Sequence, residues 1–154
     1  MSNKIKLYLD NCSYNRPFDD RKQLTVRLEI SAKLYIQNQI KDGVYELVWS
    51  YMNDYENGNN PYEEKREAIM IWREIANYIC ESSEMIREKG KHIQKFDIKV
   101  KDALHWACAI SSKCEYFITT DGFLLKKKKG FQEIELINPV DFIREMENKN
   151  ERNY

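Results

Sequence analysis

The chain has 154 residues, enough for a single domain whose core has two or three layers. Its 25 lysine and arginine residues balance 25 aspartate and glutamate residues, so the net charge is zero and a polyanionic partner has to be held by local charge. No apolar run approaches the roughly 18 residues that a membrane span needs. We therefore expect a soluble domain over residues 1–148 and a frayed tail over 149–154.

The four cysteines, Cys12, Cys80, Cys108 and Cys114, form no C-x-x-C pair, and no histidine stands at zinc-finger spacing from them. The N-terminal stretch lacks the apolar segment of a secretory signal. The cysteines are therefore predicted to be reduced packing residues of a cytoplasmic protein.

Period-two alternation of apolar residues predicts a first strand that ends at Asp10. Asp20 and Gln23 have the spacing of a capping box for a helix that runs to about residue 41, where Gly43 closes it. The apolar residues of this helix recur at helical spacing, so the sequence predicts a well-buried helix.

The segment 44–50 is rich in β-branched and aromatic residues and predicts a second strand. A short helix stopped by Gly58 follows, and a longer helix is expected over residues 60–80, with an asparagine and a proline at its start. Ser82 then caps another helix, which is predicted to end at Gly90.

A buried helix is predicted to begin at Asp102, within the stretch KDALHWACAISSK. Two further strands are expected, at EYFITT (115–120) and EIELINP (133–139), followed by a terminal helix from about Val140. Strands that alternate with helices imply parallel crossovers. The predicted fold class is therefore α/β, a three-layer α/β/α sandwich around a parallel sheet of four or five strands.

Four acidic residues fall where such a sheet places its chemistry. Asp10 follows the first strand, Asp121 follows the third, Glu56 lies one short helix past the second, and Asp102 opens a helix near the same edge. Carboxylates without basic partners repel one another, and a divalent cation relieves the repulsion. Oxygen ligands without clustered Cys or His favour Mg²⁺ or Mn²⁺.

Each acid also has a purely structural interpretation. Asp10 and Asp121, the latter followed by glycine, are both suited to ordinary turns. Asp102 can cap a helix or complement its dipole, and Glu56 can be a solvated helix residue. The metal-site prediction depends on the set of four.

Two stretches resemble the PIN-domain family over nearly the whole chain. LYLDNCSYNRPF resembles the aspartate motif of its first strand, and KDALHWACAISSKCEYFITTDGFL resembles its paired DALH and TTD region. The spacing within SYMNDYE matches the family's serine-to-glutamate spacing, which favours Glu56 over Glu46 or Asp54. No acid follows Asp121 directly, and that absence would weaken a second metal site.

The resemblance implies that Asp10, Glu56, Asp102 and Asp121 are the metal-binding and catalytic acids of a Mg²⁺- or Mn²⁺-dependent ribonuclease. Toxins of toxin-antitoxin pairs are among the similar proteins, so the expected partners are an RNA substrate, an antitoxin protein and a second copy of the chain. The leading hypothesis is an endoribonuclease. The alternative is a non-catalytic PIN-fold module that binds nucleic acid or protein.

Several neighbouring residues have a predicted supporting role. Thr119 and Asn11 are candidates for orienting the carboxylates, and Arg16 is a candidate for binding an RNA phosphate. The lysine run 126–129 is expected to form a solvated basic face. His105 is predicted to be packed or hydrogen-bonded rather than a metal ligand.

Two other enzyme classes rank lower. A phosphatase of the haloacid-dehalogenase type would use Asp10 as its nucleophile, but it needs a second aspartate where Cys12 stands. A metal-free nuclease would need His92 and His105 as an acid–base pair, and nothing in the sequence forces these two together.

Overall fold

The computed structural model describes residues 3–14, 24–127 and 133–152. They form a five-stranded sheet of order β3-β2-β1-β4-β5 in which every neighbouring pair is parallel. The strands are β1 (Lys6–Leu9), β2 (Glu46–Ser50), β3 (Tyr78–Cys80), β4 (Tyr116–Ile118) and β5 (Glu135–Ile137). The helical elements are η1 (Asn11–Ser13), α1 (Leu24–Lys41), α2 (Tyr51–Gly58), α3 (Glu63–Ile75), α4 (Glu84–Gln94), α5 (Val100–Ser111), α6 (Gly122–Lys126) and α7 (Pro139–Arg152).

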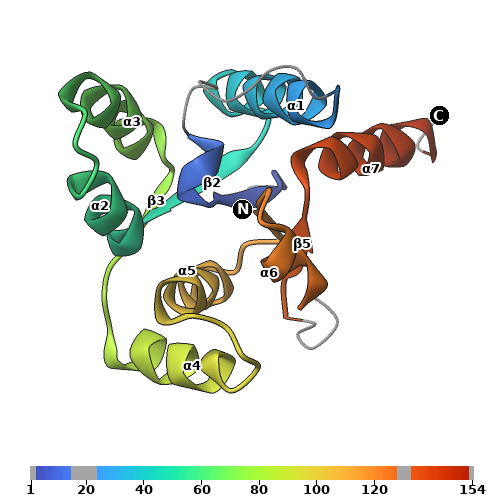
Figure 1. Cartoon of the computed structure of the whole chain (residues 1–154). Helices are drawn as coiled ribbons and strands as arrows, with labels where there is room; N and C mark the ends of the chain where they lie inside the picture. The colour runs from blue at the N-terminus through green and yellow to red at the C-terminus, as the bar shows by residue number, and fades with distance from the viewer. Residues whose placement is uncertain (1–2, 15–23, 128–132, 153–154) are drawn as a thin grey trace.

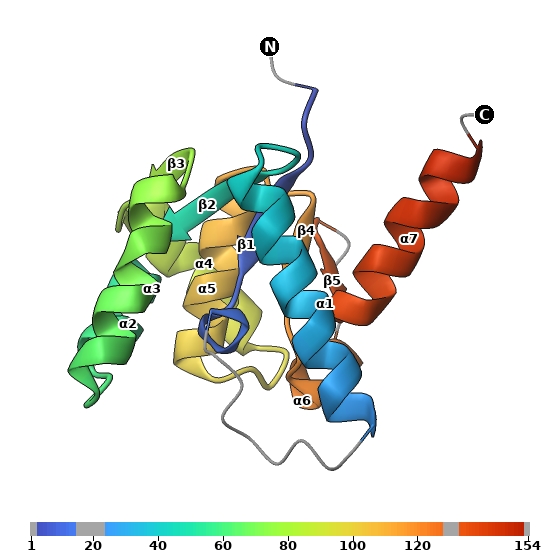
Figure 2. The same cartoon turned by 90° about the horizontal axis from the view of Figure 1, so that it is seen from above.

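Helices cover both faces of the sheet, which confirms the predicted three-layer α/β/α class (Figure 1). Successive strand residues point to opposite faces, so β1 sends Leu7 and Leu9 into one core and Tyr8 into the other. The first core is completed by α1, α3 and α7, which lie toward the viewer in Figure 2. The second is completed by α4, α5 and α6.

The helix predicted over residues 60–80 is confirmed over most of its length and is wrong in its last five residues. α3 ends at Ile75, and Ala76 turns the backbone to an extended conformation. Asn77 then bonds Leu47 of β2 twice, through its backbone N–H and through its side-chain oxygen, at 2.9 Å each. The next three residues form β3, the edge strand, because this docking leaves them alongside β2.

Two helix boundaries near the second core also differ from the prediction. Ser83, and not Ser82, caps α4, and the helix continues through Gly90 to Gln94. Gly90 does not terminate the helix: a Cβ atom there would lie 2.9 Å from Leu104 Cδ2 of α5. Glycine at this position therefore lets α4 and α5 pack closely. α5 begins at Val100, two residues before the predicted start.

α1 is less buried than the sequence analysis predicts. Its described part begins at Leu24, so the predicted capping box lies outside the described residues. Gly43, with φ of 78°, closes the helix as predicted. Ala32, Ile36 and Ile40 are buried, whereas four larger apolar side chains are about half exposed or more, namely Leu24, Leu28, Leu34 and Tyr35.

The C-terminal helix and the cysteines complete the fold. α7 continues to Arg152, into the segment predicted to be frayed, and Lys149 Nζ donates to the Tyr116 hydroxyl at 2.7 Å. Cys80, Cys108 and Cys114 are free and buried, as predicted for packing residues. Burial raises the pKa of Cys114 to about 12. Within the described ranges, no helix combines the length and apolar character needed to cross a membrane.

Candidate functional site

The centre of the sheet brings the ends of β1 and β4 together. The chain passes from β1 to β2 on one side and returns to β4 on the other, so the strand order reverses between β1 and β4. Leu9 pairs with Ile118, and the backbone N–H of Asp10 donates to the Ile118 carbonyl at 3.2 Å. Open α/β sheets bind their ligands beyond the carboxyl ends of the strands at such a reversal.

A cavity of about 320 Å³ lies at this edge, and all four predicted acids line it. They come from four separate segments: the end of β1, the second turn of α2, the first turn of α5 and the loop after β4. No lysine or arginine is among the cavity-lining residues in the described part of the chain, which are Asp10, Asn11, Glu56, Asp102, His105, Phe117, Thr120 and Asp121.

The two acids rejected in favour of Glu56 have other roles. Asp54 accepts a hydrogen bond from Trp49 Nε1 at 2.8 Å and lies 3.4 Å from Arg73 Nε. Glu46 is the first residue of β2, at the opposite end of that strand from the cavity. Of the three neighbouring candidates, only Glu56 lines the acidic cavity.

A buried threonine holds the carboxylate of Asp10. Thr119 Oγ1 donates to Asp10 Oδ2 at 2.5 Å and accepts from the backbone N–H of Asp121 at 3.0 Å. The Thr119 side chain has no solvent exposure. The Thr119 hydroxyl thus joins the carboxylate that follows β1 to the backbone of the acid that follows β4.

Asp121 has both of the roles considered for it: it holds a local turn of the backbone and it lines the acidic cavity. It is the N-cap of the short helix α6, where Oδ1 accepts from the backbone N–H groups of Phe123 and Leu124 at 2.9 and 3.4 Å. Its side chain also lines the acidic cavity. Capping engages only one carboxylate oxygen, which leaves Oδ2 for a ligand.

Of the four acids, Asp102 has the carboxylate with the fewest contacts that hold it in place. Within the described chain, no hydrogen bond or ion pair reaches its carboxylate. Burial, followed by the negative charge of Asp121, raises its pKa above the ordinary aspartate value; Asp10 and Glu56 add to the rise and His105 opposes it. The neighbouring acids of the cavity therefore disfavour a negative charge on Asp102.

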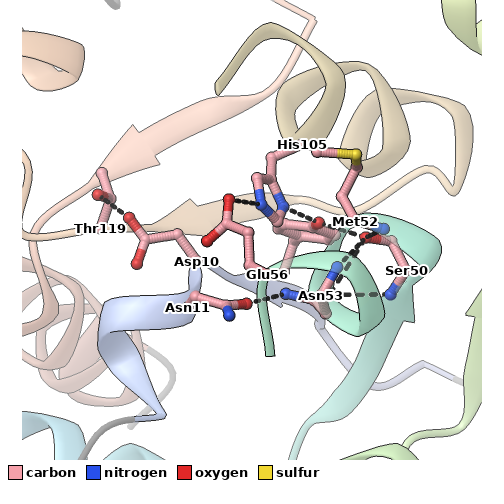
Figure 3. A network of polar contacts seen from close by, with 9 residues as sticks. Asp10, Asn11, Ser50, Met52, Asn53, Glu56, His105 and Thr119 are labelled. Atoms are coloured by element: carbon pink, nitrogen blue, oxygen red, sulfur yellow. Dashed lines mark hydrogen bonds and ion pairs between the residues drawn. The ribbon is translucent and has the colours of Figure 1, made fainter. Parts of the chain in front are cut away.

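A chain of buried side chains holds Glu56 on the other side of the cavity (Figure 3). His105 is 2% exposed, and its Nε2 lies 2.6 Å from Glu56 Oε1. Its Nδ1 contacts the Tyr8 hydroxyl, which lies 2.6 Å from Ser50 Oγ. The prediction that His105 is hydrogen-bonded is confirmed, while Tyr8 and Ser50 are absent from the predicted site.

The direction of the hydrogen bonds between Tyr8, His105 and Glu56 follows from which of these groups can donate. Burial raises the pKa of Tyr8 well above its ordinary value, so the hydroxyl keeps its proton. The Glu56 carboxylate can only accept, so His105 Nε2 carries a proton and donates it to Glu56. A neutral imidazole then accepts at Nδ1 from the Tyr8 hydroxyl, and Ser50 shares its one proton between Tyr8 and Asn53 Oδ1, which lie 2.6 and 3.2 Å from its Oγ. In this arrangement the ring fixes the Glu56 carboxylate.

The start of α2 anchors the same chain of contacts. Ser50 is its N-cap and forms a capping box with Asn53. Asn53 Nδ2 donates to Asn11 Oδ1 at 2.8 Å. Asn11, which was predicted to orient a carboxylate, lines the cavity. Its side-chain oxygen accepts the hydrogen bond from Asn53.

The residues present suit a hydrated divalent cation. Among the described residues, no three His, Cys, Asp or Glu side chains form a group that could hold a metal ion directly between them. Mg²⁺ keeps several of its waters and is commonly held by one or two carboxylates. The cavity has room for such waters, since one water occupies about 30 Å³ of liquid volume. Its all-oxygen carboxylate donors match the same class of ion.

The remaining predicted residues lie apart from this cavity or outside the described chain. Arg16 and the second half of the lysine run lie outside the described residues. Lys127 Nζ is 3.9 Å from Asp97. His92 lines a different cavity, beside α4, and His105 lines the acidic one. The two histidines therefore do not face a common cavity.

The fold is similar to two solved structures. The crystal structure of VapBC2 from Rickettsia felis bound to a DNA fragment from their promoter has a TM-score of 0.54 and 14% identity, covering 87% of this chain and 98% of that chain. The 2.2 Å structure of VapBC-1 from nontypeable Haemophilus influenzae has a TM-score of 0.51 and 16% identity, covering 88% and 99%. No protein-family model and no curated protein matches the chain. At these identities the likeness shows the fold alone, which is PIN-like α/β.

Proposed function

We propose that the protein is a Mg²⁺- or Mn²⁺-dependent endoribonuclease. The observation that carries the proposal is the convergence of Asp10, Glu56, Asp102 and Asp121 on one cavity at the reversal of the strand order. When bound there, the ion would activate water and neutralise charge on a phosphodiester. The four carboxylates would hold the ion and its waters.

Two neighbouring side chains act by positioning these acids. Thr119 fixes one oxygen of Asp10, and His105 fixes one oxygen of Glu56. On Glu56, the His105 contact engages Oε1 and leaves Oε2 for the ion or its waters. Hydrogen bonds of this kind orient metal ligands and tune their basicity.

The proposal extends to a toxin-like role with an antitoxin partner. It is supported by the resemblance to PIN-domain toxins and by the fold similarity to two VapBC structures. The exposed apolar side chains of α1, Leu24, Leu28, Leu34 and Tyr35, are the kind of surface that a protein partner or a second copy covers.

A non-catalytic PIN-fold binding module is the second candidate. It is favoured by the lack, within the described residues, of a group of three His, Cys, Asp or Glu side chains that could hold a metal ion directly between them. A binding module would retain its partner when the acids are replaced. A nuclease would lose cleavage on the same replacement.

Cleavage of mixed RNA by purified protein separates these candidates. The wild type should cleave with Mn²⁺ and not with EDTA, and Asp10→Asn should be inactive because it removes one ligand charge while its amide oxygen still accepts from Thr119. Asp97→Asn is the matched control: residue 97 is exposed, lies outside the cavity and has φ of 62°, which asparagine tolerates. Equal cleavage by wild type and Asp10→Asn would overturn the nuclease proposal.

A further inference from the structure

A second groove adjoins the acidic cavity and shares two of its acids. It has a volume of about 600 Å³ and lies between the end of α2 and the start of α5. Glu56 and Asp102 belong to both hollows, so a ligand that extends out of the acidic cavity can enter the groove directly. The other groove residues are Asn59, Lys99, Val100 and Lys101.

The walls of this groove offer two cations for the phosphates of a polyanion and an apolar surface for its uncharged part. Lys99 and Lys101 are exposed, and Val100 adds an apolar surface that is 52% exposed. The chain has no net charge, so electrostatic attraction of nucleic acid has to come from local cations of this kind. Lys99 also precedes α5 without a side-chain cap, which leaves first-turn backbone N–H groups of that helix available to an anion.

The two groove lysines differ from Lys89 and Lys127, which are held in ion pairs. Lys89 Nζ is 2.5 Å from Glu133, and Lys127 Nζ is 3.9 Å from Asp97. Among the described residues, no ion pair or side-chain hydrogen bond engages Lys99 or Lys101, although Asp102 is the next residue in the sequence. Neither cation is therefore neutralised by an ion pair, and Lys101 has a cation–π contact with Tyr55.

An exposed aromatic ring lies beside one of these cations. Tyr55 is 54% exposed, and Lys101 Nζ lies 5.4 Å from the centre of its ring. An exposed ring next to lysines that line a groove is an arrangement with which proteins stack a base while the lysines contact the backbone of a single strand.

We infer that this groove binds single-stranded RNA next to the phosphodiester held in the acidic cavity. Lys99 and Lys101 contact backbone phosphates, and Tyr55 stacks on a base. The inference rests on the proposed nuclease function for its choice of RNA, and it assigns the path by which the strand leaves the reacting site.

Binding of a short fluorescein-labelled single-stranded RNA, measured by anisotropy in the Asp10→Asn background, tests the inference without cleavage. Lys99→Ala/Lys101→Ala should weaken binding about tenfold and lower the slope of log affinity against log salt by about 1.4, the contribution of two phosphates. Lys4→Ala/Lys41→Ala is the control, because it removes two lysines that precede β1 and β2, at the other end of the sheet.

Tyr55→Ala provides a second test with a different signature. It removes a stacking surface and no charge, so it should weaken binding and leave the salt slope unchanged. Equal weakening by both lysine pairs, an unchanged affinity in the Lys99/Lys101 variant, or no RNA binding by the parent protein would overturn the inference. Cleavage by the wild type with Mn²⁺, followed separately, decides the nuclease function independently.

Discussion

The two sides of the acidic cavity are built differently. On one side, Glu56 is fixed by a series of buried hydrogen bonds that runs through His105 and Tyr8 to Ser50, the N-cap of α2. On the other, Asp121 is exposed and held by a local helix cap, and Asp102 has no hydrogen-bond partner among the described residues. The buried side is part of the core, whereas the exposed side carries uncompensated charge. Substitutions should therefore affect stability in opposite directions on the two sides.

The largest effect on activity is expected on the exposed side. Asp121→Asn keeps the cap of α6, because asparagine caps as well as aspartate, but it removes one negative charge. Loss of a metal ligand costs several kcal/mol of transition-state stabilisation, so RNA cleavage should fall on the order of 1000-fold. The metal-free melting temperature should rise, because repulsion with Asp102 is relieved.

Calorimetry in EDTA and an RNA cleavage assay check both parts of this prediction. Asp97→Asn makes the same chemical change outside the cavity and should leave cleavage intact. An Asp121→Asn protein that cleaves like the wild type would show that this aspartate serves only as a helix cap.

His105→Ala should lower activity and stability together. Tyr8 loses a buried partner and Glu56 loses the hydrogen bond that orients it. An unsatisfied buried polar group costs about 1–3 kcal/mol, and loss of a positioning residue lowers metal affinity or activity about 10- to 100-fold.

His105→Gln separates positioning from packing, since its amide can still donate toward Glu56. This variant should recover part of the metal affinity, which can be measured by Mn²⁺ titration. If the alanine and glutamine variants bind Mn²⁺ with the same affinity while both stay folded, the hydrogen bonds through His105 have only a structural role.

Replacing Thr119 by valine should have a smaller effect. The change keeps the β-branched shape and removes the hydroxyl that donates to Asp10 and accepts from the Asp121 backbone. We expect a loss of cleavage of about tenfold and a destabilisation of about 1 kcal/mol, measured by urea unfolding. Thr119→Ser retains the hydroxyl and should remain near wild type; equal losses in both variants would point to packing.

The smallest effect is a pH dependence of stability in EDTA-treated protein. The pKa of Asp102 is raised in the folded state, so the folded protein binds this proton more tightly than the unfolded chain does. Its stabilising contribution is complete below the ordinary aspartate pKa of about 3.9 and is lost as pH rises through the folded-state value. Asp102→Asn should thus be more stable than wild type at neutral pH, with the difference narrowing toward acid. A pH-independent difference would contradict the shift.

The sheet was largely predictable because each central strand has a local signal. Alternation around Leu7 and the apolar run before Ser50 are visible in the sequence. The edge strand β3 was missed because its three residues continue an apolar helical pattern. Its pairing with β2 depends on the contacts between Asn77 and Leu47, thirty residues apart, which no local pattern reports.

The four acids could be predicted for a similar reason, whereas Tyr8 and Ser50, which help to hold them in place, were not predicted. Parallel strands bring their carboxyl ends to one edge, so Asp10 and Asp121 follow from strand ends alone. Tyr8 has the pattern of an ordinary alternating strand residue, and its contact with His105 spans 97 positions. Ser50 did carry a usable signal, since a serine three residues before Asn53 at a strand end predicts an N-cap.

Direct binding of Mn²⁺, measured by electron paramagnetic resonance on metal-free protein, tests the metal site most directly. The acidic cavity is expected to bind the ion in the wild type and in Asp97→Asn, and to lose most of that binding in Asp10→Asn, because Asp10 is the acid that Thr119 holds at the centre of the sheet. Equal Mn²⁺ binding by all three proteins, or none by the wild type, would contradict a metal site formed by these four carboxylates.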